Sequence, residues 1–308
     1  MEKLAHFFID DTIWCLRDLA RQKPKSIYDI PFFKMLKNGH DDYGMTVQLN
    51  LFYRTDFFYG NDEFTLKEVP DTYKDEFKSA KSWLRFAFHA KQEFPDYPYV
   101  NATYGDVKNN YEAITNEIKR LAGEECLASA IVTHWLPMSK EGCRALADCG
   151  AKFISCSSGN RTNFSGDASV LPYGHAARLM QNRQPETMLF TRDINDEKIA
   201  CSLCAHNHID QSQYDEIKTK NASILDKETG LMFKEMGYGP CLNLYDQEGI
   251  KKRLAELNGC EFIGTGVHEQ YFYSDYYNHI PDYDERYYLL GKILKEYGYR
   301  FITADEMK

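Results

Sequence analysis

The first apolar segment of the chain, residues 4–12, ends in two adjacent carboxylates, Asp10 and Asp11. The segment is too short for a helix and is rich in Phe and Ile, so we predict a buried strand. Adjacent side chains on a strand point to opposite faces, but where the strand ends the chain turns and both carboxylates can reach one site. In parallel sheets and barrels this edge carries the chemistry. The alternative is that Asp11 caps a helix starting near Ile13 and that Asp10 is solvated.

Three further apolar segments end in histidine, at His89, His134 and His268. A single histidine at a strand end is more often a hydrogen-bonded structural residue than a ligand. A barrel, however, brings the ends of its parallel strands together at one rim. Together with the Asp pair, these residues therefore predict a site that is rich in imidazole and carboxylate groups.

His89 and Glu93 are four residues apart, so one helical turn would aim both side chains the same way. With Asp11 they would supply one imidazole and two carboxylates to one divalent ion, such as Zn, Mn, Ni, Co or Fe. Pro95 limits any helix here to about one turn. The alternative is a surface Glu93 beside a structural His89.

Two other spacings suggest metal or redox chemistry less strongly. His206 and His208 form an H-x-H pair, but they precede a helix cap in a polar turn. Cys201 and Cys204 form a C-x-x-C motif without a second Cys pair at zinc-ribbon spacing. We interpret these cysteines as reduced core thiols of a cytosolic protein.

Alternating strands and helices predict an α/β fold. Predicted strands span 4–12, 45–53, 83–89, 127–134, 151–156, 187–193, 198–206, 261–267 and 299–303, and predicted helices span 13–21, 27–36, 104–121, 139–149, 210–220, 250–257 and 284–296. We expect the second of these helices to end at Asn38-Gly39. The alternation implies parallel strands with right-handed crossovers, and about seven such units fit a barrel better than an open sheet. No Gly-rich phosphate loop follows the first strand, which disfavours a dinucleotide fold.

The bulk composition is that of an ordinary globular protein. The chain has 308 residues and a formal net charge of −9, without a Lys/Arg block, which argues against nucleic-acid or anionic-membrane partners. No run reaches the length of a membrane span and no signal peptide is visible, so we expect a cytoplasmic protein. We expect one domain over residues 1–308, with an insertion at about 55–82.

The order of these motifs resembles that of the polysaccharide deacetylase, or NodB-like, family. The resemblance rests on the F-I-D-D at the first strand end, the histidine turn at 89–93, the late strand ending in His268 and the tail YGYRFIT at 297–303. It implies a distorted (β/α)7 barrel of the glycoside hydrolase/deacetylase type. It also implies hydrolysis of N- or O-acetyl groups, mostly on sugars, with one divalent metal ion.

The resemblance assigns a role to each matching position. Asp10 would be the general base, Asp11 and His89 metal ligands, and His268 the general acid that protonates the leaving group. Glu93 stands where the family has its second metal-binding histidine.

Other positions depart from the family pattern. Thr12 replaces the usual Gly after the Asp pair, and His134-Trp135 occupies the place of an Arg- and Pro-containing motif that steadies the base. Asp193 is a candidate for a later family Asp, and Glu269 is a further carboxylate near the rim.

We therefore expect a metal-dependent hydrolase that removes acetyl or similar acyl groups from a small-molecule or oligosaccharide substrate. One alternative is a non-catalytic, carbohydrate-binding relative on the same barrel. The other is a metal-free, glycosidase-like enzyme, or another C–N hydrolase, that uses paired carboxylates.

Overall fold

The computed structural model describes residues 2–55, 63–93, 98–99, 102–136, 138–155, 212–213, 216–217, 223–237, 239–276 and 278–307. Several sequence predictions lie outside these residues: the strands at 187–193 and 198–206, Pro95, Asp193, Cys201, Cys204, His206 and His208.

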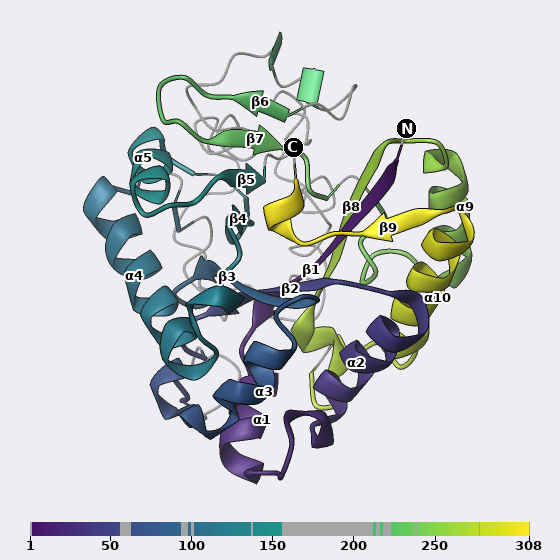
Figure 1. Cartoon of the computed structure of the whole chain (residues 1–308), viewed down its shortest axis with the longest axis horizontal. Helices are drawn as coiled ribbons and strands as arrows, with labels where there is room; N and C mark the ends of the chain where they lie inside the picture. Colours follow the sequence, from purple (N-terminus) through teal and green to yellow (C-terminus); the bar gives the residue numbers. More distant parts are fainter. Residues whose placement is uncertain are drawn as a thin grey trace, which may run out of the picture.

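The larger sheet is parallel throughout and has the order β3-β2-β1-β8, with β9 also beside β1 (Figure 1). Its strands are β1 (Lys3–Thr12), β2 (Val47–Phe52), β3 (Leu84–Ala90), β8 (Phe262–His268) and β9 (Tyr299–Phe301). The first strand is central because both of its neighbours, β2 and β8, pair with it along most of their length. The carboxyl ends of β1, β3 and β8 therefore meet at one edge.

A second sheet has the order β4-β5-β7-β6, and its pairs are parallel except for the antiparallel pair of β6 and β7. Its strands are β4 (Ala130–Ile131), β5 (Phe153–Ser155), β6 (Ser223–Leu225) and β7 (Met232–Lys234). A parallel bridge between Phe86 and Leu127 connects β3 to the chain entering β4. The amide of Gly239 donates to the carbonyl of Gly264, which connects the chain after β7 to β8.

The α/β fold with parallel strands that the sequence predicts is confirmed. Among the described residues, however, the hydrogen bonds between strands do not form one closed barrel.

In Figure 1 the helices lie to the left of, below and to the right of the strands, whereas β6 and β7 lie at the top. They are α1 (Trp14–Gln22), α2 (Pro31–Tyr43), α3 (Lys74–Ser79), α4 (Tyr104–Leu121), α5 (Lys140–Asp148), α9 (Gln247–Leu257) and α10 (Tyr283–Glu296). Helix α4 packs with α5, and α10 packs with both α2 and α9. Within the described ranges, no helix has the length and apolar character needed to cross a membrane.

The predicted end of the second helix at Gly39 is wrong. Helix α2 continues through Gly39 and ends at Gly44, which adopts a left-handed conformation with φ 72°. A Cβ atom at Gly39 would collide with the ring of Tyr287 in α10. Gly39 therefore permits close packing of two helices, and Gly44 is the residue that ends the helix.

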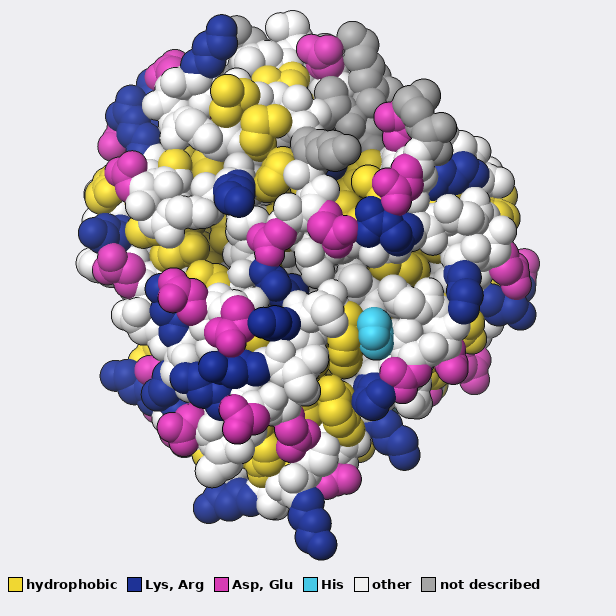
Figure 2. Space-filling view, viewed as in Figure 1, with side chains coloured by type: hydrophobic (Ala, Val, Ile, Leu, Met, Phe, Trp, Pro, Cys, Tyr) yellow, Lys and Arg dark blue, Asp and Glu magenta, His cyan; other side chains and the backbone are white. Residues whose placement is uncertain are grey.

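The strands β2 and β8, and β1 from Ala5 onward, are buried on both faces. On β1, Ala5, Phe7 and Ile9 belong to the core between the sheet and the helices, whereas Phe8 packs in a second, inner cluster with Ala87 and other apolar side chains. On the outer surface, Figure 2 shows acidic and basic side chains interspersed over the visible face. The inner face of β1 also carries polar side chains, and the last of them, Asp10, lies in the candidate site.

His6 is the first of these inner polar side chains. Its burial leads us to expect that the free energy of unfolding falls at acidic pH. Its side chain is buried, and Nδ1 lies 3.2 Å from the carbonyl oxygen of Ile302. Burial lowers the pKa of His6 to about 4, from about 6.5. Because the unfolded chain binds this proton more readily, the stabilisation is fully present above pH 6.5 and is lost as the pH falls through 4.

The difference of about 2.5 between the two pKa values corresponds to about 3 kcal/mol, as an order of magnitude. We expect His6→Gln to remove this part of the pH dependence. Urea denaturation of both proteins between pH 7 and pH 4 measures it. Equal slopes of unfolding free energy against pH in the two proteins would contradict the prediction.

Candidate metal centre

A local irregularity of β1 brings both carboxylates to one site. The pairing of β1 with β2 shifts register between Ile9 and Thr12, and Asp11 adopts a left-handed conformation with φ 57°. Asp tolerates this conformation better than most residues. As a result both carboxylates approach the ring of His89: Asp10 Oδ1 lies 3.7 Å from Nδ1, and Asp11 Oδ1 lies 3.0 Å from Nε2.

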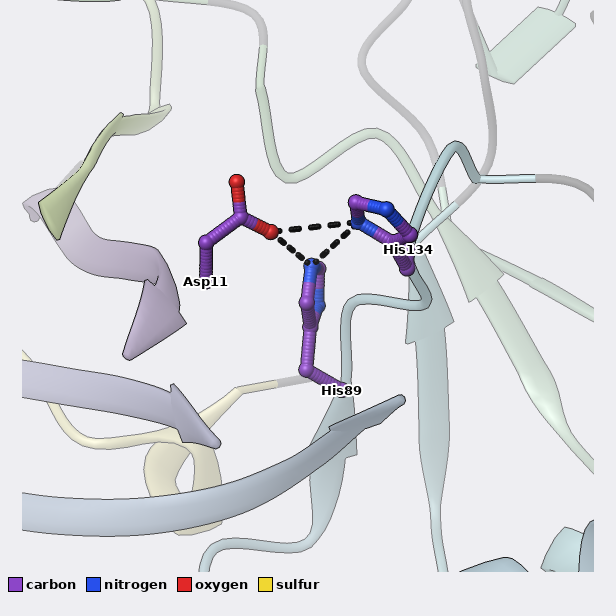
Figure 3. Close-up of side chains that lie close together, drawn as sticks. All are labelled: Asp11, His89 and His134. Carbon is purple, nitrogen blue, oxygen red and sulfur yellow. Dashed lines mark hydrogen bonds and ion pairs between the residues drawn. The ribbon is translucent and has the colours of Figure 1, made fainter. Parts of the chain in front are cut away.

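Asp11, His89 and His134 form a buried group whose side chains point toward one another (Figure 3). Asp11 Oδ1 lies 3.0 Å from His89 Nε2 and 3.1 Å from His134 Nδ1. The two imidazole nitrogens are 3.2 Å apart. Asp11 lies next to the last residue of β1, His89 near the end of β3 and His134 just after β4, so the carboxyl ends of three strands supply one donor each.

In each imidazole one nitrogen faces the group, His89 Nε2 or His134 Nδ1, and is called the inner nitrogen here. The other, outer nitrogen determines the protonation of the inner one. His89 Nδ1 lies 2.5 Å from the carbonyl oxygen of Val132, and His134 Nε2 lies 2.9 Å from that of Glu93. A carbonyl oxygen only accepts, so each outer nitrogen must carry a proton. In neutral rings the inner nitrogens then present lone pairs, next to a carboxylate oxygen. Three lone pairs facing one another are satisfied by a proton on one of the rings or by a metal ion, and such carbonyl-anchored imidazoles are typical of metal ligands.

The remaining contacts keep Asp11 charged. Gln270 Nε2 donates to Asp11 Oδ2 at 2.7 Å, which leaves Oδ1 for the imidazoles. Burial acts to raise the pKa of Asp11, but the charges and hydrogen bonds of His134, His268 and His89 hold that pKa well below its usual range. For His89, burial acts to lower the pKa, and the two carboxylates of Asp10 and Asp11 raise it overall. The group therefore combines an anionic carboxylate oxygen with two imidazole nitrogens.

Asp10 and His268 stand beside this group. They are paired neighbours on β1 and β8, and both line a narrow indentation that is otherwise walled by Phe8 and small residues. Burial raises the pKa of Asp10 to about 6, even though His89 acts to lower it. His268 Nδ1 lies 3.0 Å from Asn243 Oδ1, so its Nε2 is left to face Asp11 Oδ2 at 4.0 Å.

Glu93 does not belong to the three-residue group. Its side chain is buried, with Oε1 4.0 Å from the outer nitrogen of His134, and its carbonyl oxygen anchors that nitrogen. Residues 91–93 form bends instead of the helical turn that we expected, so the four-residue spacing does not aim Glu93 with His89. His134 takes the position that we assigned to Glu93.

Glu269 serves the helix that follows the Asp pair. Its carboxylate accepts hydrogen bonds from the amides of Ile13, Trp14 and Cys15 at 2.6, 2.9 and 2.6 Å. These are the first amides of α1, which has no cap from its own preceding side chain. The alternative interpretation, in which Asp11 caps this helix, is therefore wrong. The Asp11 carboxylate faces the histidines instead. Glu269 instead fixes the corner at the end of β1 to the end of β8.

Glu269→Ala is expected to destabilise the fold by about 3–5 kcal/mol, because up to three buried amides lose their acceptor. Urea denaturation measures this change. Glu248→Ala is the control, since the Glu248 side chain is exposed on the first turn of α9, where it pairs with Lys251. If Glu269→Ala lowered the free energy of unfolding no more than the control does, Glu269 would not be the residue that holds the start of α1.

Trp135 follows His134 in the chain and is half-buried. It adopts φ 61°, and its ring lies 5.9 Å from that of His134, centroid to centroid. The site also contains Asn50, Asn243 and Gln270, which the sequence analysis missed. Asn50 could have been found, because Gln48 and Asn50 are polar residues at alternate positions of an otherwise apolar strand.

No known protein family and no curated protein sequence matches the chain. Among solved structures, the 4-alpha-glucanotransferase from Thermococcus litoralis is similar over 99% of this chain, with a TM-score of 0.53 and 10% identity. The match covers 40% of that protein, so this chain spans less than half its length. The Xyl-CE4 domain of a multidomain xylanase from the hindgut metagenome of Trinervitermes trinervoides matches 72% of this chain and 93% of that chain, with 11% identity and a TM-score of 0.31. The first similarity agrees with the fold described above; at 10% identity it concerns the fold alone.

Proposed function

We propose that the protein is a metal-dependent hydrolase that removes acetyl or similar acyl groups from a carbohydrate-like substrate. The observation that carries the proposal is the convergence of Asp11, His89 and His134, with both imidazoles anchored from behind by carbonyl oxygens. The sequence resemblance to polysaccharide deacetylases supports the reaction class. In that family the metal is held by one Asp and two His, and His134 would supply the imidazole that Glu93 cannot.

The donor set fits a divalent transition metal ion. Two imidazole nitrogens and one carboxylate oxygen are the ligands of open, catalytic zinc-type sites. A divalent ion bound there would polarise the scissile carbonyl and increase the acidity of a nearby water. Asp11 would also provide the negative charge that offsets the charge of the ion.

Asp10 and His268 are suited to move the protons. Asp10 would accept one proton from the attacking water while the water oxygen adds to the acyl carbon. As the bond from that carbon to the leaving nitrogen or oxygen breaks, protonated His268 would donate a proton to the leaving atom. The products are a carboxylic acid and a free amine or alcohol. Their pairing on neighbouring strands supports this division, since both side chains line the same narrow indentation.

Trp135 supports a carbohydrate-like substrate. An indole ring beside the site offers an apolar face with a polar edge, which suits the face of a sugar ring. Its position directly after His134 would place a bound sugar next to the metal ligands.

The test is acetate release from N-acetylated and O-acetylated sugars by the purified protein. We expect release to stop after treatment with a chelator and to return with Zn, Mn, Ni, Co or Fe. Asp11→Ala should stay inactive when the same ions are added. Hydrolysis that resists the chelator would instead favour the metal-free hydrolase. Stoichiometric sugar binding without turnover under any ion would favour the carbohydrate-binding alternative.

A further inference from the structure

Two amide side chains of β2 form a buried relay that ends on Asp10. Asn50 Nδ2 donates to Asp10 Oδ1 at 2.7 Å, and Gln48 Nε2 donates to Asn50 Oδ1 at 2.7 Å. Gln48 Nε2 also donates to the carbonyl oxygen of Ala130, at 3.0 Å. Both amide side chains are almost completely buried, with exposed fractions of 0% for Asn50 and 1% for Gln48.

The groups at the two ends of the relay determine the orientation of both amides. An ionised Asp10 and the carbonyl of Ala130 can only accept hydrogen bonds. Asn50 must therefore present its NH₂ group to Asp10, which turns its oxygen toward Gln48. Gln48 must in turn donate in both directions. These donors and acceptors fit one arrangement of the two amides, in which Gln48 Oε1 is buried without a hydrogen-bond partner among the described residues.

We propose that Asn50, oriented by Gln48, is the positioning residue for Asp10, and that it fixes the carboxylate so that Oδ2 is the oxygen that accepts the proton in hydrolysis. This inference rests on the proposed function, in which Asp10 is the proton acceptor. Among the described residues, Oδ1 is the oxygen that receives a hydrogen bond. Asp10 also lines the indentation beside His268, so the carboxylate oxygen that Asn50 does not hold is the one assigned to the proton.

The relay positions Asp10 without adding a charge to the site. A cation bonded to Asp10 would weaken the carboxylate as a base, whereas a neutral amide restricts its rotation and leaves the negative charge largely intact. The sequence resemblance led us to expect an Arg in this role from the segment that contains His134. That segment supplies a metal-ligand candidate instead, and Asn50 performs the positioning from a neighbouring strand.

The test compares Asn50→Leu and Gln48→Leu with the wild type in acetate release. A reacting group displaced by about 1 Å can cost about 100-fold in rate, so we expect kcat of Asn50→Leu to fall by about that factor. KM and metal content should stay within about twofold, because neither depends on the rotation of Asp10. Gln48→Leu should lower kcat less, by about 3- to 10-fold, since it acts through Asn50. Thr46→Val is the control: Thr46 lies two residues before Gln48 and bonds the carbonyl of Ile302, and this variant should keep its kcat.

Combining substitutions separates positioning from general damage. In an Asp10→Asn background, Asn50→Leu should lower kcat no further, because the group that it positions no longer accepts a proton. Equal, additive losses in both backgrounds would overturn the inference, as would a change confined to KM. If Asn50→Leu does not fold, Asn50→Ser is used in the same comparison, since serine is too short to reach Asp10.

A failure of the proposed function remains distinguishable. If the wild type binds metal but releases no acetate from any probe, the coupling of Asn50 to Asp10 is measured by unfolding of the metal-free protein instead. Asp10→Ala and Asn50→Leu should then shift the denaturation midpoint non-additively. Additive shifts would overturn the positioning of Asp10 by Asn50, whether or not the protein is a hydrolase.

Discussion

Replacing His134 with alanine is expected to weaken divalent-metal binding by more than about 100-fold. The loss should exceed the 10–100-fold typical of residues that only support a ligand, because His134 Nδ1 is one of the three donors that converge at 3.0–3.2 Å. Without this nitrogen, Asp11 and His89 provide only two donors. Elemental mass spectrometry after equilibration with Zn, and titration against a competing chelator, measure the change.

Glu93→Gln is the matched comparison for this prediction. Glu93 contacts His134 from behind through its carbonyl oxygen, which the substitution retains, and its carboxylate lies 4.0 Å from the outer nitrogen. We expect less than about a 10-fold loss of affinity. The sequence-based assignment of Glu93 as a ligand makes the opposite prediction, with a large loss for Glu93→Gln and a small one for His134→Ala. The two variants together therefore decide which residue completes the group.

The general location of the site could be predicted from the sequence because it depends on strand ends. Asp10, Asp11, His89, His134 and His268 all lie at or just after the end of an apolar segment. A parallel α/β arrangement brings such ends together whatever the details of the loops. The pattern of polar residues that follow apolar segments was therefore enough to predict where the site lies.

The choice among these residues could not be predicted, because it depends on local backbone conformation. The role of Glu93 rested on a helical turn after β3, and the chain forms bends there instead. The convergence of Asp10 and Asp11 depends on the left-handed conformation of Asp11. No sequence pattern predicts that conformation. Gly39 illustrates the same difficulty: glycine can end a helix or allow a ring from another helix to approach, and only the packed structure distinguishes the two.

Long-range partners were also beyond the sequence. Glu269 meets the amides at the start of α1 from more than 250 positions away in the chain. Its neighbour Gln270 similarly reaches Asp11. Such contacts satisfy buried donors and acceptors, and they follow from the pairing of β1 with β8, which brings these two segments together. Any carboxylate or amide near the rim would have appeared equally suitable in the sequence.

Asp10→Asn is expected to separate metal binding from catalysis. Asparagine keeps an oxygen that can accept the hydrogen bond from Asn50, so the fold and the relay should persist. It cannot take a proton from water at neutral pH, and the loss of a general base lowers kcat by about 10²- to 10⁴-fold. Metal content should remain that of the wild type, because Asp10 is not one of the three converging donors.

Acetate release and elemental analysis on the same preparation check both parts of this prediction. Asp11→Asn is the comparison, since it changes the adjacent carboxylate in the same way but removes the anionic donor of the group. Asp10→Asn should therefore give a metal-loaded, inactive protein, and Asp11→Asn a protein with weakened metal binding. An Asp10→Asn protein that hydrolyses at the wild-type rate would show that another group deprotonates the water. One that loses its metal would instead place Asp10 among the ligands, and the positioning of Asp10 by Asn50 would then serve the metal and not the proton.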